Sequence, residues 1–397
     1  TMKRYLLALF APFLLLAEPA YVPVPIQEHY SRLMTAVKRN RNKEVINEGR
    51  YITFFHKDSP FTRETHSHLA LALHKSGKYI EANRHFTLYI STELATKYFD
   101  DAVKHKFAIA KHFEDNGFDK AFGVDNLLTA NKIYSELVSL TASTDYFTKA
   151  VDGKFTIARY LEKKGFSQTF GVGNLEKANR IYTEIILSVL STEYFSEAIE
   201  RKFEIAKYLE KKGLNKKFGE DQLALATEIY TEIITSMPRS EMTAEALFRK
   251  GRILTHSNEY KDGIETYEML IRRFPKSAYA PDGYLGIANV YIRQITNKFP
   301  DEELIARAQL NLDRFRDAFP SEPRLAQAEK LLGGMQERFA KELFEIGDFY
   351  QRTKKIAAAK IYYQTVLAQY PLTPSATLSA KRMEKIAKKE ATTPLPA

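Results

Sequence analysis

Apolar and aromatic side chains recur through the middle of the chain with a period of 48 residues. Three segments align without gaps, beginning at Tyr98, Tyr146 and Tyr194. The repeated columns are Phe107, Phe155 and Phe203; Ala110, Ala158 and Ala206; Phe122, Phe170 and Phe218; and Tyr134, Tyr182 and Tyr230. A fixed period of this length is typical of a solenoid, in which each unit packs against its neighbours.

Each copy contains two stretches with the apolar spacing of a helix, joined by a polar segment. In the second copy the spacing predicts a helix from about residue 146 to 164, which ends at Gly165 because glycine suits a left-handed C-cap. Residues 165–174 are rich in glycine and polar side chains, which predicts a loop. The second helix is predicted to begin near Asn174, an N-capping residue, and to run to about Leu190. One such pair cannot bury its own apolar face, so the copies must stack.

The same spacing continues outside the three copies. One segment has this spacing at Gly251, Gly263, Tyr267 and Pro275. The same intervals recur 96 residues later, at Gly347, Ala359, Tyr363 and Pro371. These intervals resemble the tetratricopeptide repeat, a helix pair of 34 residues. The resemblance implies that small residues let the helices approach, that the ring packs into the next repeat, and that proline ends the second helix. The 48-residue copies fit this pattern with eight residues inserted, which we interpret as an enlarged loop between the helices.

We therefore predict an all-α protein, a tetratricopeptide-type right-handed superhelical solenoid of about eight helix pairs. The predicted divisions are a signal peptide (1–20), N-terminal helical repeats (21–97), the three 48-residue repeats (98–240), further tetratricopeptide repeats (241–373), and a capping helix with a frayed tail (374–397).

The N-terminal segment has the pattern of a secretory signal. Lys3 and Arg4 precede an apolar run from Tyr5 to Ala17, which is too short to span a bilayer as a helix. Small and turn-forming residues follow this run. We therefore expect export.

Charge and cysteine content narrow the function classes. The net charge is +10, but lysine and arginine are interleaved with acidic residues instead of forming the basic stripe that nucleic-acid binding requires. The chain has no cysteine, which excludes disulfides, thiolate zinc sites and cysteine nucleophiles. We expect protein partners and no nucleic acid.

Motifs for catalysis or cofactor binding are missing. There is no phosphate-binding loop, dinucleotide fingerprint or HExxH sequence, and Gly171 and Gly173 are interpreted as turn glycines. His66, His68 and His74 lack the spacing of metal ligands and are interpreted as surface histidines. Glu162 and Glu210 each precede two lysines, which is typical of a solvated helix end. We predict no catalytic, cofactor-binding or metal-binding residues, no small-molecule substrate and no enzymatic activity.

The C-terminal half, residues 241–386, resembles the outer-membrane protein assembly factor BamD family, the tetratricopeptide subunit of the β-barrel assembly machinery. The residues that carry the resemblance in the last repeat are Glu345, Phe349, Tyr350, Ala359, Tyr363, Tyr370 and Pro371. It implies a location at the periplasmic face of the outer membrane and contact with the barrel-forming assembly subunit. It also implies binding of unfolded outer-membrane proteins. Members of that family are anchored by a lipidated cysteine, and this chain has no cysteine. Either the anchor is missing here, or attachment comes entirely from protein partners.

Two alternatives remain open: a cytosolic tetratricopeptide chaperone or adaptor, and another periplasmic repeat protein of envelope maintenance. In each case the expected mechanism is groove binding on a face lined by the first helices of the pairs. Extended peptides would lie there against tyrosine and phenylalanine, while lysine and arginine attract carboxylates. The sequence assigns no individual partner-binding residue.

Overall fold

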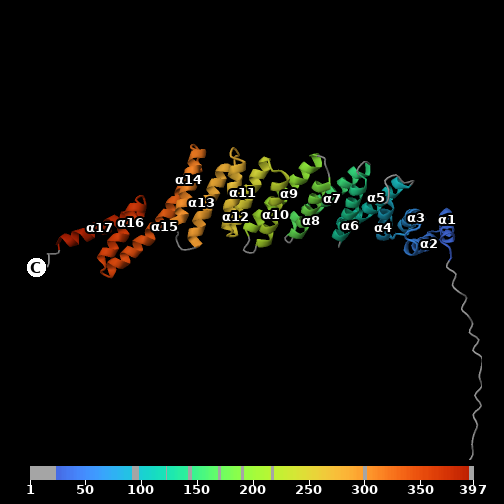
Figure 1. Ribbon diagram of the computed structural model, residues 1–397, viewed down its shortest axis with the longest axis horizontal. Helices are drawn as coiled ribbons and strands as arrows, with labels where there is room; N and C mark the ends of the chain where they lie inside the picture. The colour runs from blue at the N-terminus through green and yellow to red at the C-terminus, as the bar shows by residue number, and fades with distance from the viewer. Residues whose placement is uncertain are drawn as a thin grey trace, which may run out of the picture. The chain divides into compact units, whose positions relative to one another are not determined.

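The chain folds into helices throughout its described part. The computed structural model describes residues 24–91, 98–121, 123–141, 145–168, 171–188, 192–215, 219–297 and 302–392. Within these ranges it has seventeen helices and no strands (Figure 1), which confirms the all-α fold. The predicted signal peptide and the column of Phe122, Phe170 and Phe218 lie outside the described residues.

The helices form eight consecutive pairs followed by one more helix. Their bounds are α1 Ile26–Lys38, α2 Asn42–Phe55, α3 Thr62–Lys75, α4 Tyr79–Ile90, α5 Phe99–Asp115, α6 Gly123–Leu140, α7 Asp145–Ser167, α8 Val172–Ser188, α9 Thr192–Leu214, α10 Glu220–Ser236, α11 Glu241–His256, α12 Tyr260–Arg273, α13 Ala280–Asn297, α14 Glu302–Ala318, α15 Leu325–Arg352, α16 Ile356–Gln369 and α17 Pro374–Thr392. Among these, no helix is long and apolar enough to cross a membrane.

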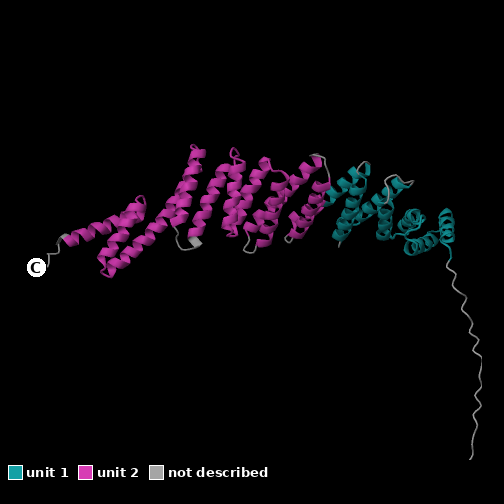
Figure 2. Ribbon diagram, in the orientation of Figure 1, with its two compact units in different colours: residues 1–157 teal, residues 158–397 magenta. Residues whose placement is uncertain are grey.

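Two compact units divide the chain, residues 1–157 and 158–397, with the boundary inside α7 (Figure 2). Within each unit a helix packs on the one that follows it, and first helices also contact the first helix of the next pair, as α3 contacts α5 and α11 contacts α13. This is the stacking that the repeat pattern predicts.

In the second and third 48-residue copies, the eight extra residues mostly lengthen helices. The helices α7 and α9 each have 23 residues, whereas α11, in a repeat without the insertion, has 16. The loop predicted over residues 165–174 is therefore wrong at both ends. The first helix continues past Gly165 to Ser167, and the second begins at Val172, before Asn174.

Close helix contact, not a left-handed cap, explains Gly165. A Cβ atom on Gly171 would lie 2.0 Å from the carbonyl oxygen of Gly165, closer than any real contact. The same relationship holds between Gly213 and Gly219, where the distance is 2.1 Å. Gly171 does lie in the turn before α8, as predicted, and the backbone of that turn touches the end of α7 at Gly165. The turn interpretation is wrong for Gly173, which lies inside α8.

The tetratricopeptide columns pack as predicted in the second unit. Tyr267 of α12 is buried between Gly251 of its own pair and Gly286 of the next. A Cβ atom at either glycine would lie within 2.6 Å of the tyrosine ring. Small residues on the first helices therefore make room for one ring that joins two pairs.

Candidate functional site

A fully buried tyrosine in each 48-residue copy donates a hydrogen bond to a buried glutamate. The pairs are Tyr134–Glu114, Tyr182–Glu162 and Tyr230–Glu210, at 2.5, 2.7 and 2.9 Å. Burial, together with the neighbouring carboxylate, raises the pKa of each tyrosine well above its usual range. The prediction that Glu162 and Glu210 lie in solvated helix ends is wrong, because both side chains turn inward to accept from tyrosine while the adjacent lysines carry the exposed charge.

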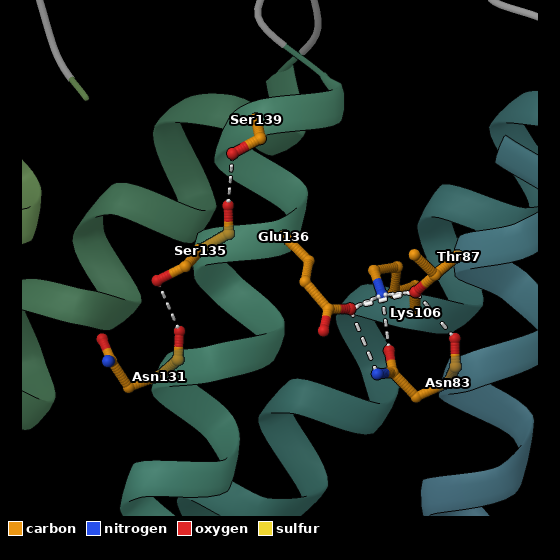
Figure 3. Close-up of polar contacts among 7 residues, drawn as sticks. All are labelled: Asn83, Thr87, Lys106, Asn131, Ser135, Glu136 and Ser139. Carbon is orange, nitrogen blue, oxygen red and sulfur yellow. Dashed lines mark hydrogen bonds and ion pairs between the residues drawn. The ribbon is translucent and has the colours of Figure 1, made fainter. Parts of the chain in front are cut away.

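A buried lysine connects three successive helices in the first unit. Lys106 of α5 is 0% exposed, and its Nζ donates to Asn83 Oδ1 and Thr87 Oγ1 of α4, both at 2.6 Å (Figure 3). It also forms an ion pair with Glu136 of α6. Burial lowers the pKa of Lys106, and Glu136 opposes that effect.

The lysine recurs every 48 residues, at Lys154, Lys202 and Lys250. In the second unit, Lys202 donates to Thr183 of α8 and forms an ion pair with Glu232 of α10. Sequence reasoning missed these networks, although the signal was present, since each of the first three lysines immediately precedes the Phe107, Phe155 and Phe203 column.

Four histidines of the first unit form two cross-helix pairs. His66 of α3 faces His85 of α4 with 2.9 Å between the two Nδ1 atoms, and His74 of α3 faces His105 of α5 at 3.2 Å. Burial lowers the pKa of all four, to about 4 for His66. The interpretation of His66 and His74 as surface histidines is therefore corrected. His66 and His68 do face different partners, since His68 lies beside Glu64 and Tyr98.

A groove between α12 and α14 is the candidate partner-binding site. It has a volume of about 670 Å³, and its buried side is made by Tyr284, Ile287 and Tyr291 of α13. Tyr284 stacks on Phe315 of α14 with ring centroids 5.1 Å apart, and Asn311 donates to the Tyr284 carbonyl oxygen at 3.0 Å. These contacts hold the aromatic surface rigid.

Cations border this groove on both sides. Arg272 lies on α12, and Arg307 and Arg314 lie on α14. Burial raises the pKa of Tyr284, and Arg314 opposes that rise. Burial and Glu268 raise the pKa of Tyr291, and Arg307 and Arg314 oppose them.

Two further groups of the groove are available to a ligand. The Oε1 atom of Gln294 is buried without a hydrogen-bond partner among the described residues, and Leu310 on the rim is 51% exposed. The groove thus offers apolar surface, one open acceptor and an excess of positive charge, since its four basic residues outnumber the two acids that also line it, Glu265 and Glu268 of α12.

The groove is formed by other helices than the sequence predicts. The sequence predicts a face lined by first helices, whereas here α13 is the only first helix, and the walls are the second helices α12 and α14. Elsewhere in the described ranges, no group of three or more histidine, aspartate or glutamate side chains is placed to hold a metal ion.

Comparison with known proteins finds tetratricopeptide repeats. The tetratricopeptide repeat model matches residues 245–277 and 343–373, which are α11–α12 and the α15–α16 pair. No curated protein matches the sequence significantly.

Several solved structures are similar to this chain at low sequence identity. The C-terminal part of a tetratricopeptide repeat-containing protein from Cytophaga hutchinsonii is 14% identical over 88% of this chain and 98% of that one, with a TM-score of 0.29. The TPR2AB domain of yeast Sti1, solved in complex with Hsp90, is 16% identical over 67% and 98%, with a TM-score of 0.23. Yeast Tom70 is 13% identical over 92% and 89%, with a TM-score of 0.24.

The two matched segments coincide with helix pairs in which glycine and tyrosine pack as tetratricopeptide spacing requires. The one pair between them, α13–α14, packs against both. These two segments are therefore tetratricopeptide repeats, and helix pairs of this kind serve as scaffolds for protein–protein interaction.

Proposed function

We propose that this protein is a non-enzymatic periplasmic scaffold of outer-membrane β-barrel protein assembly. It binds the barrel-forming assembly subunit and unfolded segments of outer-membrane proteins, and it associates with the inner face of the outer membrane through these partners. The observation that carries the proposal is the aromatic, cation-bordered groove of α12–α14. This groove lies in the C-terminal half, where the sequence resembles the BamD family.

The chemistry of the groove suits an extended segment with apolar side chains and a carboxylate. Tyr284 and Tyr291 provide flat, rigid surface for apolar side chains. Arg272 and Arg314 attract a carboxylate and are not engaged in ion pairs within the described residues. Gln294 Oε1 is available to a backbone N–H of the segment.

The test is a photo-crosslinking amino acid at Leu310 of the full chain, expressed in its native host. We expect crosslinks to the barrel-forming assembly subunit or to unfolded outer-membrane proteins. A crosslinker at Leu378 of α17, which is 46% exposed and outside the groove, serves as the matched control. The double variant Arg272→Glu, Arg314→Glu should remove the Leu310 crosslinks. Recovery of only unrelated proteins at Leu310 would refute the proposed partners.

The proposed compartment is tested separately. Fractionation and sequencing of the mature N-terminus should find the chain in the envelope, with the predicted signal segment removed. A full-length chain in the cytosol would instead favour the adaptor function.

A further inference from the structure

A second groove, between α8 and α10, has the opposite charge. It has a volume of about 600 Å³, and its lining includes five carboxylates and one arginine: Glu176, Glu184, Asp221, Glu228, Glu232 and Arg180. The chain as a whole carries a net charge of +10. An acidic groove on a basic protein is therefore a local arrangement and does not follow from overall composition.

Part of this negative charge is already neutralised. Arg180 pairs with Glu176 at 3.0 Å, and Lys202 pairs with Glu232 from beneath the groove. Asp221 and Glu228 are exposed and make no ion pair with any described residue. The groove thus keeps two carboxylates on the α10 wall that can accept a cation from outside.

A buried amide points to the same kind of ligand. Asn179 lines the groove and is 5% exposed, yet its Oδ1 atom has no hydrogen-bond partner within the described part of the chain. A buried acceptor without a donor is costly, so a donor from a bound molecule would be favourable.

In the first unit, the asparagine at the position that corresponds to Asn179 has a hydrogen-bond donor. Asn83 lies two repeats, or 96 residues, before Asn179, and its Oδ1 atom accepts from Lys106 at 2.6 Å (Figure 3). In the second unit the corresponding lysine, Lys202, bonds to Thr183 and Glu232 instead. Asn83 Oδ1 therefore accepts from a lysine of the chain, whereas the lysine that corresponds to it does not donate to Asn179 Oδ1.

We propose that the α8–α10 groove binds a basic segment of a partner protein, with one arginine or lysine side chain donating to Asn179 Oδ1. Asp221 and Glu228 lie seven residues apart on α10, about 10 Å along its axis, so they pair with different basic side chains of that segment. The amide oxygen and the two carboxylates all accept hydrogen bonds, and arginine and lysine side chains only donate them. Leu187 at the groove is 83% exposed and provides an apolar contact beside the charged site. This site is separate from the α12–α14 groove, so either proposal can fail without the other.

Binding is tested on the full chain with a short fluorescein-labelled peptide of arginine, serine and one leucine. A peptide with glutamate in place of arginine is the control. Fluorescence anisotropy should show binding of the arginine peptide alone, with an affinity that falls as salt concentration rises. Asn179→Ala and the double variant Asp221→Lys, Glu228→Lys should each weaken binding about tenfold.

A matched double variant separates the groove from general electrostatic attraction. Glu342→Lys with Glu345→Lys changes two exposed acids of α15 and alters the net charge by the same amount. It should leave the affinity unchanged. An equal loss in this control would overturn the proposal, as would unchanged affinity in the groove variants.

Thermal unfolding distinguishes a ligand site from a structural amide. Asn83→Ala should lower the melting temperature, because it removes an acceptor from buried Lys106. Asn179→Ala should leave it unchanged. If Asn179→Ala instead lowers the melting temperature as Asn83→Ala does and keeps the peptide affinity, the amide belongs to the lysine network and the proposal is wrong.

Two other occupants of the groove are also tested. Displacement of the peptide by micromolar Ca²⁺ would assign the groove to a metal ion. Self-association of the chain that the Asp221→Lys, Glu228→Lys variant abolishes would assign it to a second copy. Either result would overturn the proposal.

Discussion

The hydroxyl of Tyr182 donates to the carboxylate of Glu162 at 2.7 Å, with both side chains buried between α7 and α8. Burial raises the pKa of Glu162, whereas the hydrogen bond from Tyr182 and the nearby Arg201 act in the opposite direction. The tyrosine therefore does more than fill space: it helps to keep a buried carboxylate in its ionised form.

We expect Tyr182→Phe to lower the free energy of unfolding by about 1–3 kcal/mol, because Glu162 loses its buried donor. Tyr230→Phe should cost less, since Glu210 keeps Arg249 at 3.0 Å, whereas Arg201 lies 3.6 Å from Glu162. Urea unfolding of the full chain, followed by circular dichroism, measures both. A larger loss in Tyr230→Phe would contradict this explanation.

The sequence predicts the tyrosine column but not its partner. Tyr134, Tyr182 and Tyr230 stand at a fixed interval in helices with apolar spacing, so their burial follows from the repeat. Glu162 lies beside Lys163 and Lys164, and such a run is typical of an exposed helix end. Its inward orientation depends on how far the first helix continues. The sequence did not predict that length, because the inserted residues were interpreted as a loop.

The two grooves were beyond sequence reasoning for another reason. The α12–α14 groove combines Arg272, Tyr291 and Arg314 from three helices. Periodicity identifies which face of one helix is apolar, but the gap between two second helices depends on their packing on the helix between them. The pairs themselves were predictable because each is local in the sequence.

Lys106 is expected to stabilise the first unit more than Lys250 stabilises the second. Lys106→Met should cost roughly 2–3 kcal/mol, because it leaves Glu136 and the half-buried acceptors Asn83 and Thr87 without their donor. Breaking a fully buried ion pair would cost more, but the Glu136 side chain is 26% exposed. Lys250 is half-buried and donates to Thr231 at 3.0 Å, so Lys250→Met should cost less than about 1 kcal/mol. Chemical unfolding of the two variants tests the difference, and equal losses would contradict it.

The histidine pairs predict that acid destabilises the first unit. Each Nδ1–Nδ1 contact has room for one proton, so protonation of both rings places two N–H groups against each other. Around His66 and His85, Arg84 and Arg50 oppose protonation and Glu81 favours it. Around His74 and His105, His112, Lys75 and Lys104 oppose it and Asp101 favours it.

The direction in which stability changes with pH follows from the linkage between proton binding and folding. The pKa of each paired histidine is lowered in the folded chain, so the unfolded chain binds more protons as the pH falls. Stability that is complete above the ordinary value of 6.5 should decline as the pH falls toward about 4, the folded value for His66. Hydrogen exchange in α3–α5 at pH 7 and pH 5 measures this decline. The variant His85→Gln, His105→Gln should reduce the pH dependence, and an undiminished dependence would exclude the pairs as its cause.

Glycine substitutions should have opposite effects at packed and open positions. A Cβ atom on Gly286 would lie 2.5 Å from the ring of Tyr267, which is buried and cannot move aside. We expect Gly286→Ala to destabilise the chain by about 1–3 kcal/mol through overpacking. Gly333, inside α15, has no heavy atom within 4 Å of such a Cβ, so Gly333→Ala should stabilise the chain by about 0.5–1 kcal/mol, because alanine loses less backbone entropy in a helix. Both values come from urea unfolding. Stabilisation by Gly286→Ala would show that Tyr267 is not confined between its two glycines, and destabilisation by Gly333→Ala would show that the α15 surface at this position is not open.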